Sequence, residues 1–455
     1  MLQEKISFSP EQIAGKLLTM QEFPFSPEDV NELVRQSILN KTPSIVTSNG
    51  KSVCQRCGND RSYLFAVFPH STCKNNTCLY CRNCIMMGRI TQCEPLYEGA
   101  AVVWPQHADP CRWGGQLTVS QEAAAQRIVS AIEQKSELLV WAVCGAGKTE
   151  MLFPGITTAL QKGLRIVLAT PRTDVVRELL PRFQQAFPQV PIQALYGDSE
   201  EKQGDAQLLI STTHQLYRYS RAFDVVIIDE IDAFPYHNDD SLQFAAARAA
   251  KTDAARIYLT ATPRKKEKSK IRKRKLPAAF IPQRFHGHPL PVPKLKLTPT
   301  LKRQLSKGRL PQSLIKTIEI QQKGSRQLLL FVSTITYAGA VKAFLENDFN
   351  VDSVHAEDPD RGEKVQRFRD RTIDILVTTT ILERGVTFPS VDVFVIDAGH
   401  HVFDEAALVQ IAGRAGRSPE DPDGDVIFYH FGKTNAMLDA QEAIIHMNKK
   451  ARKEL

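Results

Sequence analysis

The chain of 455 residues is predicted to be an α/β protein with two tandem parallel-sheet lobes behind a small cysteine-rich module. Three observations predict this fold class. From Leu117 onward, short apolar runs alternate with amphipathic stretches, as expected for buried parallel strands joined by helices. A strongly basic and then proline-rich stretch divides this pattern in two. Most of the cysteines lie ahead of the pattern.

Composition excludes several other classes of protein. Hydrophobic residues make up 42% of the chain and charged residues 24%, which argues against a wholly disordered or collagen-like protein. No run approaches the roughly 18 apolar residues of a spanning helix, and the first residues do not lead into a signal segment. We therefore expect a cytoplasmic protein with no transmembrane segment of its own. The net charge of +8 is a modest excess that suits a polyanionic partner.

Three segments precede the lobes. Residues 1–50 show helical periodicity in places, such as Val30 to Leu39, and are predicted to be a helical segment without identifiable chemistry. Residues 51–95 hold the paired cysteines. Residues 96–116 form a connector that contains tryptophan and proline.

The cysteines predict a metal site. Eight of the nine lie between Cys54 and Cys111, and paired cysteines in a chain without a secretion signal indicate metal ligands rather than disulfides. Four thiolates complete the tetrahedral shell of a structural zinc ion and leave no position open for water. The predicted Zn²⁺ ligands are two pairs separated by 23 residues, Cys54 with Cys57 and Cys81 with Cys84.

One alternative for the ligand set stays open. Cys78 also lies two residues from a neighbour, Cys81, so Cys73 or Cys78 could replace one of the four. Cys84 is preferred because a short helix beginning at Arg82 would place the second pair at its first turn. The module is also basic and contains several aromatic residues, which suits contact with a nucleic-acid backbone and base stacking. A zinc-stapled spacer with an aromatic core is an equally good interpretation.

The apolar runs locate the strands of the two lobes. We predict lobe 1 at residues 117–263, a basic and proline-containing linker at 264–296, and lobe 2 at 297–455. The runs of lobe 1 are Glu137 to Val143, Arg165 to Ala169, Gln207 to Ile210, Asp224 to Ile228 and Arg256 to Leu259, and those of lobe 2 are Gln327 to Val332, Asp374 to Thr378 and Val391 to Ile396.

The first strand of lobe 1 leads into a predicted phosphate-binding loop. Glycines allow backbone N–H groups to approach phosphates, and the start of the following helix favours anions. Lys148 would reach the β- and γ-phosphates of ATP, and Thr149 would bind Mg²⁺. The strict pattern has glycine at its first position, where this chain has Ala142. The loop residues are Gly145, Ala146, Gly147, Lys148 and Thr149.

Two further motifs fit this loop. Asp229 and Glu230 follow an apolar run, where a carboxylate can hold Mg²⁺ opposite the loop and its neighbour can activate water. In the second lobe, Gln410, Arg414 and Arg417 lie around a short glycine turn. These arginines could bring positive charge to the γ-phosphate when the lobes close.

The segments together resemble superfamily 2 helicases, which have two RecA-like lobes. Their ordered motifs are similar to Leu117 to Gln121, Gly147 to Thr149, Ala169 to Arg172, Ser211 to Gln215, Asp229 to Asp232, Thr260 to Thr262, Phe331 to Thr334, Thr379 to Gly385, and Gln410 to Arg417. The resemblance implies a role for each further residue. Gln121 would contact adenine, although a helix cap is its commoner role, and Thr260 and Thr262 would couple ATP to lobe movement. It also implies nucleotide contacts by Arg384 and Gly385, and single-strand backbone contacts by Arg172, Thr212 and Thr213.

The cysteine module ahead of the two lobes narrows this resemblance to particular helicase families. With its Gly-Ala-Gly-Lys-Thr-Glu loop and Asp-Glu-Ile-Asp motif, the chain resembles the late-competence DNA translocase (ComFA) family, and less closely the PriA family of restart helicases. The resemblance implies a DNA-stimulated ATPase at the inner face of the cell membrane. Its partners would be single-stranded DNA, other competence proteins and the membrane DNA channel. A restart or RNA helicase, and a zinc-dependent DNA-binding scaffold with an ATP switch, remain alternatives.

The net charge is concentrated in one short segment. Residues 264–275 hold nine basic residues and one acid, which equals the +8 of the whole chain. Such a run is either a solvated linker or an extended arm that holds a nucleic-acid strand while the lobes cycle.

Overall fold

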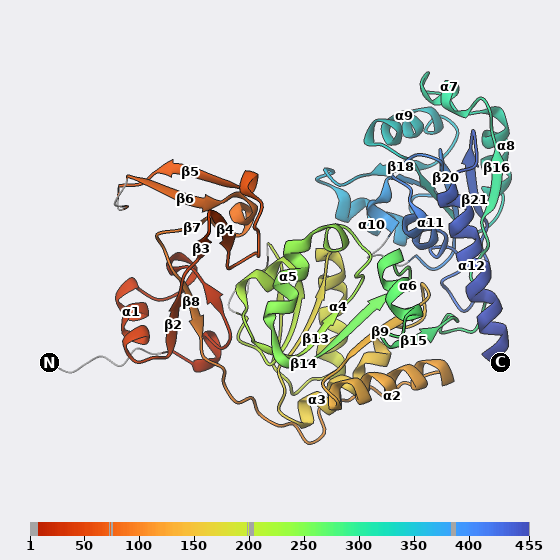
Figure 1. Cartoon of the computed structure of the whole chain (residues 1–455). Helices are drawn as coiled ribbons and strands as arrows, with labels where there is room; N and C mark the ends of the chain where they lie inside the picture. The colour runs from red at the N-terminus through yellow and green to blue at the C-terminus, as the bar shows by residue number, and fades with distance from the viewer. Residues whose placement is uncertain are drawn as a thin grey trace.

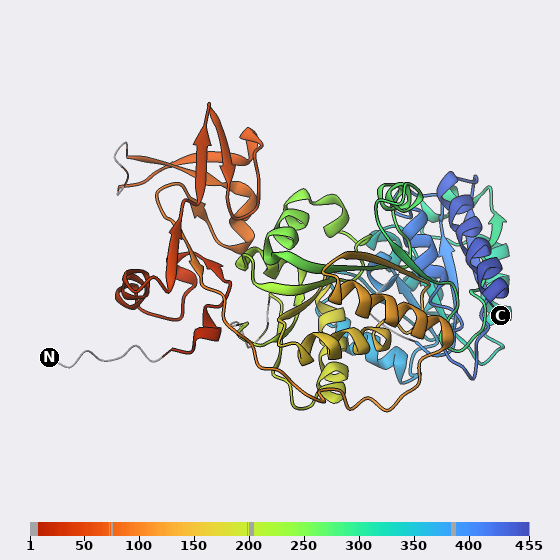
Figure 2. The ribbon, with the colours of Figure 1, turned by 60° about the horizontal axis from the view of Figure 1, so that its bottom comes forward.

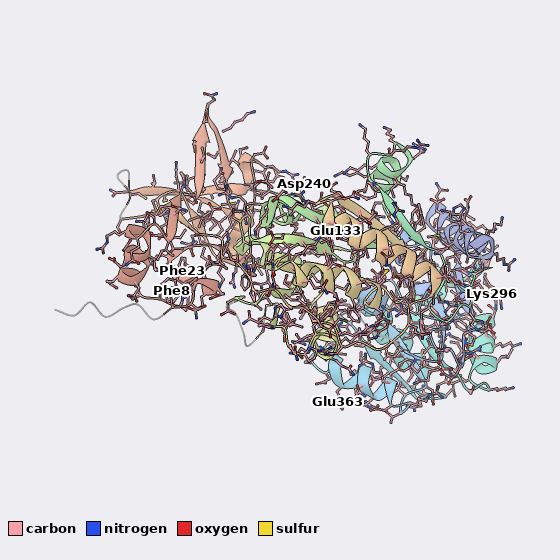
Figure 3. All side chains as sticks on the ribbon, turned by 90° about the horizontal axis from the view of Figure 1, so that it is seen from below. Phe8, Phe23, Glu133, Asp240, Lys296 and Glu363 are labelled. Atoms are coloured by element: carbon pink, nitrogen blue, oxygen red, sulfur yellow. The ribbon has the colours of Figure 1, made fainter. Side chains whose placement is uncertain are left out.

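The computed structural model describes residues 8–71, 73, 76–197, 199, 204–383 and 388–454. An N-terminal module, residues 8–99, lies beside lobe 1, and lobe 2 follows on the far side of lobe 1 (Figure 1). In Figure 3, the labelled Phe8 and Phe23 mark the module and Lys296 marks the opposite end of the molecule. The prediction of two parallel-sheet lobes behind a small module is confirmed.

The N-terminal module contains three small antiparallel sheets, with strand orders β1-β8-β2, β3-β4 and β5-β6-β7. The prediction that residues 1–50 are helical is wrong for most of the described part, where strands outnumber the one α-helix. Leu39–Thr42 pairs with Leu96–Gly99, so the segments on either side of the cysteines close one sheet. The elements are η1 (Pro10–Gln12), β1 (Leu17–Leu18), η2 (Met20–Glu22), α1 (Pro27–Arg35), β2 (Leu39–Thr42), β3 (Ile45–Ser48), β4 (Lys51–Cys54), η3 (Ser62–Leu64), β5 (Phe65–Pro69), β6 (Thr77–Cys81), η4 (Arg82–Met87), β7 (Ile90–Thr91) and β8 (Leu96–Gly99).

Lobe 1 is built on a seven-stranded parallel sheet with the order β11-β12-β10-β13-β14-β9-β15. Figure 2 shows α2 and α3 lying together on this lobe. Its elements are α2 (Val119–Glu133), β9 (Glu137–Ala142), η5 (Glu150–Leu152), α3 (Phe153–Gln161), β10 (Ile166–Thr170), α4 (Thr173–Ala186), β11 (Ile192–Leu195), β12 (Leu208–Thr212), η6 (Thr213–Arg218), β13 (Phe223–Ile228), η7 (Tyr236–Asn238), α5 (Asp240–Ala249), β14 (Ala250–Thr260), α6 (Lys265–Arg272) and β15 (Ala278–Ile281).

The predicted linker at 264–296 is largely folded onto lobe 1. Helix α6 leads into β15, which pairs with β9 in the register Ala279 opposite Val140 and adds an edge strand to the sheet. Ala279 and Ile281 are buried, because the apolar side chains of this short run pack into the core of lobe 1. The chain passes between the lobes only after Ile281 and enters the sheet of lobe 2 at Lys294.

Lobe 2 is built on a six-stranded parallel sheet with the order β16-β21-β20-β17-β19-β18. The C-terminal helix α12 packs against α11 at its outer side (Figure 1). The elements are β16 (Lys294–Leu297), α7 (Leu301–Leu305), α8 (Gln312–Gln321), β17 (Gln327–Phe331), α9 (Ile335–Leu345), β18 (Val351–Val354), α10 (Arg361–Arg369), β19 (Ile375–Thr378), η8 (Thr380–Glu383), β20 (Val391–Ile396), α11 (Glu405–Ala412), β21 (Val426–His430) and α12 (Asn435–Glu454).

The N-terminal module is fixed to lobe 1 by polar contacts. Arg248 on α5 donates from Nη1 to the Gln55 carbonyl of the module at 2.9 Å, while its Nη2 donates to the Tyr217 carbonyl within lobe 1 at 2.8 Å. Asn83 Nδ2 donates to Ser241 Oγ at 2.8 Å. These contacts join the turn regions around the cysteines to α5, whose first residue, Asp240, is labelled in Figure 3.

Candidate active site and metal centre

The predicted phosphate-binding loop lies at the carboxyl end of β9. Gly145 and Gly147 have φ values of +76° and +68°, a region that side chains with a Cβ atom rarely adopt. A Cβ atom on Gly147 would also lie 2.4 Å from Gln121 Nε2. Both glycines are therefore required by the shape of the loop.

Gln121 supports this loop from the start of α2. Its Oε1 accepts a hydrogen bond from the Thr118 N–H at 2.8 Å, and its Nε2 donates to the Ala146 carbonyl at 2.8 Å. Gln121 thus caps α2 and fixes the loop, and helix capping is the commoner role of such a glutamine. The residue also lines a cavity over this loop, and an adenine contact there stays a prediction.

Two carboxylates that directly follow β13 lie beside the loop. Lys148 Nζ lies 3.9 Å from Asp229 Oδ1. Burial raises the pKa of Asp229 to about 6, although Lys148 acts in the opposite direction. Glu230 follows with a φ of +53°, and its N–H donates to Asp229 Oδ1 at 2.8 Å. The hydroxyl of Thr149 and the carboxylate of Asp229 are oxygen ligands of the kind that Mg²⁺ prefers.

Both lobes border one cavity of about 480 Å³ over the loop. The lobe 1 side includes the loop, Gln121, Asp229 and Glu230. The lobe 2 side is lined by Gln410, Arg414 and Arg417. The structure therefore brings the predicted catalytic residues of both lobes to a single site.

Helix α11 positions the residues of lobe 2. Gln410 Oε1 accepts a hydrogen bond from the thiol of Cys144, at 2.9 Å across the lobe boundary. Arg414 is only 2% exposed, and its Nε donates to the Glu383 carbonyl at 3.1 Å. Burial, with the neighbouring charge of Arg417, lowers the pKa of Arg414. Two adjacent, desolvated guanidinium groups make this wall of the cavity favourable for a polyphosphate.

The predicted coupling residues are connected through Asp232. Thr260 Oγ1 donates to Asp232 Oδ1 at 2.6 Å, and Thr262 Oγ1 donates to Oδ2 at 2.5 Å. Arg264 donates to the Asp232 carbonyl at 3.0 Å and to the Asp404 carboxylate at 2.7 Å, just before α11. Asp232 is the last residue of the Asp229 to Asp232 motif, and the sequence alone assigns it no role. The structure places it between the nucleotide site and lobe 2.

Arg284 is a second residue to which the sequence motifs assign no role. Its side chain is buried between the lobes, and Nη1 donates to the carbonyls of Ala415, at 3.0 Å, and Gly416. The next residue, Phe285, donates its N–H to the Gly145 carbonyl at 3.0 Å. The segment after β15 thereby joins the phosphate-binding loop to the arginine turn. No local motif marks Arg284, because these partners in lobe 2 lie more than 130 residues away.

The predicted DNA-contact residues are not on an open surface in this arrangement of the lobes. Arg172 Nη1 donates to the Ile381 carbonyl at 3.0 Å, and its Nη2 lies 3.5 Å from Glu383 Oε1. Thr212 and Thr213 are buried at the end of β12. Their DNA contacts stay a prediction. Arg384 and Gly385 lie outside the described residues.

The four predicted zinc ligands lie together. Their Sγ atoms are all within 4.8 Å of one another, with 3.7 Å between Cys54 and Cys84 and 3.6 Å between Cys57 and Cys81. All four are buried. Four thiols converging at the spacing of a tetrahedral shell fit a structural zinc ion, which Cys54, Cys57, Cys81 and Cys84 would hold as thiolates.

Three parts of the chain match known protein families. Residues 5–98 match the competence protein ComFA N-terminal domain, residues 115–265 the res subunit of type III restriction enzymes, and residues 310–419 the helicase conserved C-terminal domain. The competence protein ComFA of Bacillus subtilis is 45% identical over 99% of this chain and 98% of its own length. That of Streptococcus pneumoniae is 38% identical over 94% and 97%.

Solved structures show the same fold for the lobes. A point variant of S. cerevisiae Dbp5 bound to RNA and ADP BeF3 has a TM-score of 0.55 at 16% identity, covering 75% of this chain and 94% of that one. The predicted resemblance to superfamily 2 helicases and the ComFA family is confirmed, and helicase domains of this kind imply ATPase activity. Among the described residues, no helix is both long and apolar enough to cross a membrane.

Proposed function

Because the chain belongs to the ComFA family of competence proteins, we propose that it is an ATP-dependent, single-stranded DNA translocase that drives the uptake of transforming DNA. The observation that carries the proposal is the cavity bordered by both lobes, which is lined by Lys148 from lobe 1 and by Arg414 and Arg417 from lobe 2. A site completed by two lobes can convert nucleotide binding and loss into lobe movement.

The residues of this cavity have distinct tasks in hydrolysis. The N–H groups of the loop and Lys148 hold the β- and γ-phosphates, while Arg414 and Arg417 stabilise the charge that develops on the transferred group. Glu230 orients the attacking water and accepts its proton at a carboxylate oxygen. A Mg²⁺ ion held by Thr149 and Asp229 would neutralise charge on the phosphate oxygens.

Hydrolysis removes the anion that holds the two arginines beside the loop. The lobes then separate, and the backbone contacts predicted for Arg172, Thr212 and Thr213 are remade further along the strand. Phosphate contacts position a protein without reading sequence, which suits a motor that must accept any DNA. Partners at the membrane, including a DNA channel, follow from the family alone.

The test is the ATPase rate of the full chain with single-stranded DNA, duplex DNA and RNA of equal length. We expect single-stranded DNA to give the largest stimulation, and Lys148→Ala to abolish it while leaving a folded protein. Greater stimulation by RNA would favour an RNA helicase. A DNA-binding scaffold with an ATP switch predicts little stimulated turnover, and DNA binding that survives loss of Lys148 but not of Cys54.

A further inference from the structure

A second group of metal-ligand side chains lies at the other end of the cysteine module. His70, Cys73, Cys78 and Cys93 each offer one ligand atom, and these four atoms lie within 4.8 Å of one another. We propose that they form a second structural zinc site, with three thiolates and one imidazole. Neither this site nor any role for His70 and Cys93 was predicted from the sequence.

The distances fit a shared metal ion. His70 Nδ1 lies 3.1 Å from Cys73 Sγ and 3.4 Å from Cys93 Sγ, and Cys78 Sγ lies 3.3 Å from Cys93 Sγ. With Zn–S bonds of about 2.3 Å, neighbouring ligands of a tetrahedral zinc are separated by roughly 3.5–3.8 Å, so a small outward adjustment would seat the ion. A disulfide needs about 2.05 Å between the sulfurs, and the separation of Cys78 and Cys93 is well beyond that.

Strand geometry explains why one Cys-x-x-Cys sequence serves two sites. Cys78 and Cys81 both lie on β6, where Cys78 pairs with Phe68 and Cys81 with Phe65. Side chains alternate between the faces of a strand, so residues three apart point to opposite faces. Cys81 joins the first cluster and Cys78 the second. The structure therefore favours Cys81 over Cys78 in the first cluster, because Cys78 points to the opposite face of β6.

The second cluster joins the turn after β5 to β6 and to the segment after β7. His70 and Cys73 come from the turn after β5, where the Cys73 N–H donates to the His70 carbonyl at 3.2 Å. Cys78 comes from β6, and Cys93 follows β7. Only Cys78 of the three cysteines is buried, whereas Cys93 is exposed. There is thus little apolar packing to hold the turn, and a metal ion would supply that cross-link.

The site also supports an aromatic cluster on the same hairpin. The Phe68 ring lies 5.2 Å from the His70 ring and 5.6 Å from the Tyr80 ring, and the guanidinium of Arg89 stacks 5.0 Å from Phe68. Fixing His70 on a metal ion would therefore hold the Phe68 face of the hairpin in one arrangement. The greater exposure of this site predicts that it releases zinc to a chelator faster than the buried site does.

The test is zinc content and coordination of the purified full-length protein under reducing conditions. We expect two zinc ions per chain, with an average X-ray absorption shell of about 3.5 sulfur and 0.5 nitrogen atoms per zinc, and release to a chelator in two phases. His70→Ala combined with Cys93→Ser should leave one zinc with four sulfurs. Cys111→Ser is the matched control, since Cys111 belongs to neither cluster, and it should keep two.

The wild-type measurement stands even if a variant fails to fold. A single zinc with four sulfur ligands in the wild-type protein would overturn the proposal. A Cys78–Cys93 disulfide, found by mass spectrometry in protein purified under reducing conditions, would also overturn it. The same holds if the double variant at His70 and Cys93 retains two zinc ions.

Discussion

Replacing Asp232 with alanine tests whether its carboxylate, which holds Thr260 and Thr262, is needed to couple DNA binding to ATP hydrolysis. The Asp232 side chain accepts hydrogen bonds from Thr260 and Thr262, and its carbonyl accepts one from Arg264, which also binds Asp404. Asp232 does not border the nucleotide cavity. The substitution should therefore leave ATP binding nearly unchanged while it releases the two threonines from their fixed positions.

The size of the effect follows from the two hydrogen bonds that the substitution removes. A hydrogen bond to a charged acceptor contributes about 1.5–3 kcal/mol, and leaving a buried donor unsatisfied costs a similar amount. The two hydroxyls share one carboxylate, and Thr260 Oγ1 also accepts from the Thr262 N–H at 2.9 Å, so the two effects will not add fully. We expect the free energy that holds Thr260 and Thr262 in their observed positions to fall by about 3 kcal/mol. This corresponds to roughly a 150-fold change in the population of molecules with both threonines in place.

The assay is steady-state ATP hydrolysis with and without single-stranded DNA, alongside ATP affinity. Asp232→Ala should reduce DNA-stimulated turnover about 100-fold, with a change in ATP affinity of less than about threefold. Asp239→Ala is the matched control. Asp239 caps α5 through the N–H groups of Ser241 and Leu242, so its removal costs about 1 kcal/mol of stability but breaks no hydrogen bond to the threonines. Full stimulation in Asp232→Ala, or an equal reduction in Asp239→Ala, would refute the reasoning.

Two further variants probe the catalytic carboxylate and the basic segment. Glu230→Gln should bind ATP normally but lower turnover by about 10²–10⁴-fold, because an amide cannot accept the proton of the attacking water; normal turnover would remove Glu230 from this role. Replacing exposed lysines of the basic segment with glutamine should weaken the salt dependence of single-stranded DNA binding. The slope of log K against log [salt] should become shallower by about 0.7 for each DNA phosphate that is no longer neutralised. An unchanged slope would show that the segment has no role in DNA binding. The lysines to replace are Lys265, Lys266, Lys270 and Lys273.

Local motifs allowed most of the nucleotide site to be predicted. Lys148 and Asp229 each lie just beyond the end of a buried strand, and parallel strands bring such ends to one edge of a sheet. The edge strand β15 was missed because Pro277 and Pro282 bound a run of only a few apolar residues, which is typical of a linker. Proline is tolerated at the ends of an edge strand, because one side of such a strand has no neighbouring strand that needs its N–H groups.

Other features depended on pairing that sequence spacing does not reveal. Arg284 connects the two lobes only because residues 415 and 416 fold against it and accept its hydrogen bonds. The sequence does not assign Cys78 and Cys81 to different clusters, because a Cys-x-x-Cys spacing is the same in a turn and in a strand. In a turn the two sulfurs converge, whereas in strand β6 they point to opposite faces. His70 and Cys93 were overlooked for a related reason, since neither belongs to a short motif.

The basic segment illustrates how the fold changes the meaning of a net charge. Its two half-buried members make ion pairs with lobe 2, Arg264 with Asp404 at 2.7 Å and Lys268 with Glu405 at 2.8 Å. The other seven basic residues are exposed. An extended arm would use all nine charges alike, but a helix docked at the start of α11 divides them between holding the lobes together and facing solvent. Partly exposed ion pairs contribute only about 0.2–1 kcal/mol each, so these two can break when the lobes separate. Under the proposed motor cycle, Arg264 and Lys268 would therefore lose their partners each time the lobes separate, while the seven exposed residues would face solvent throughout.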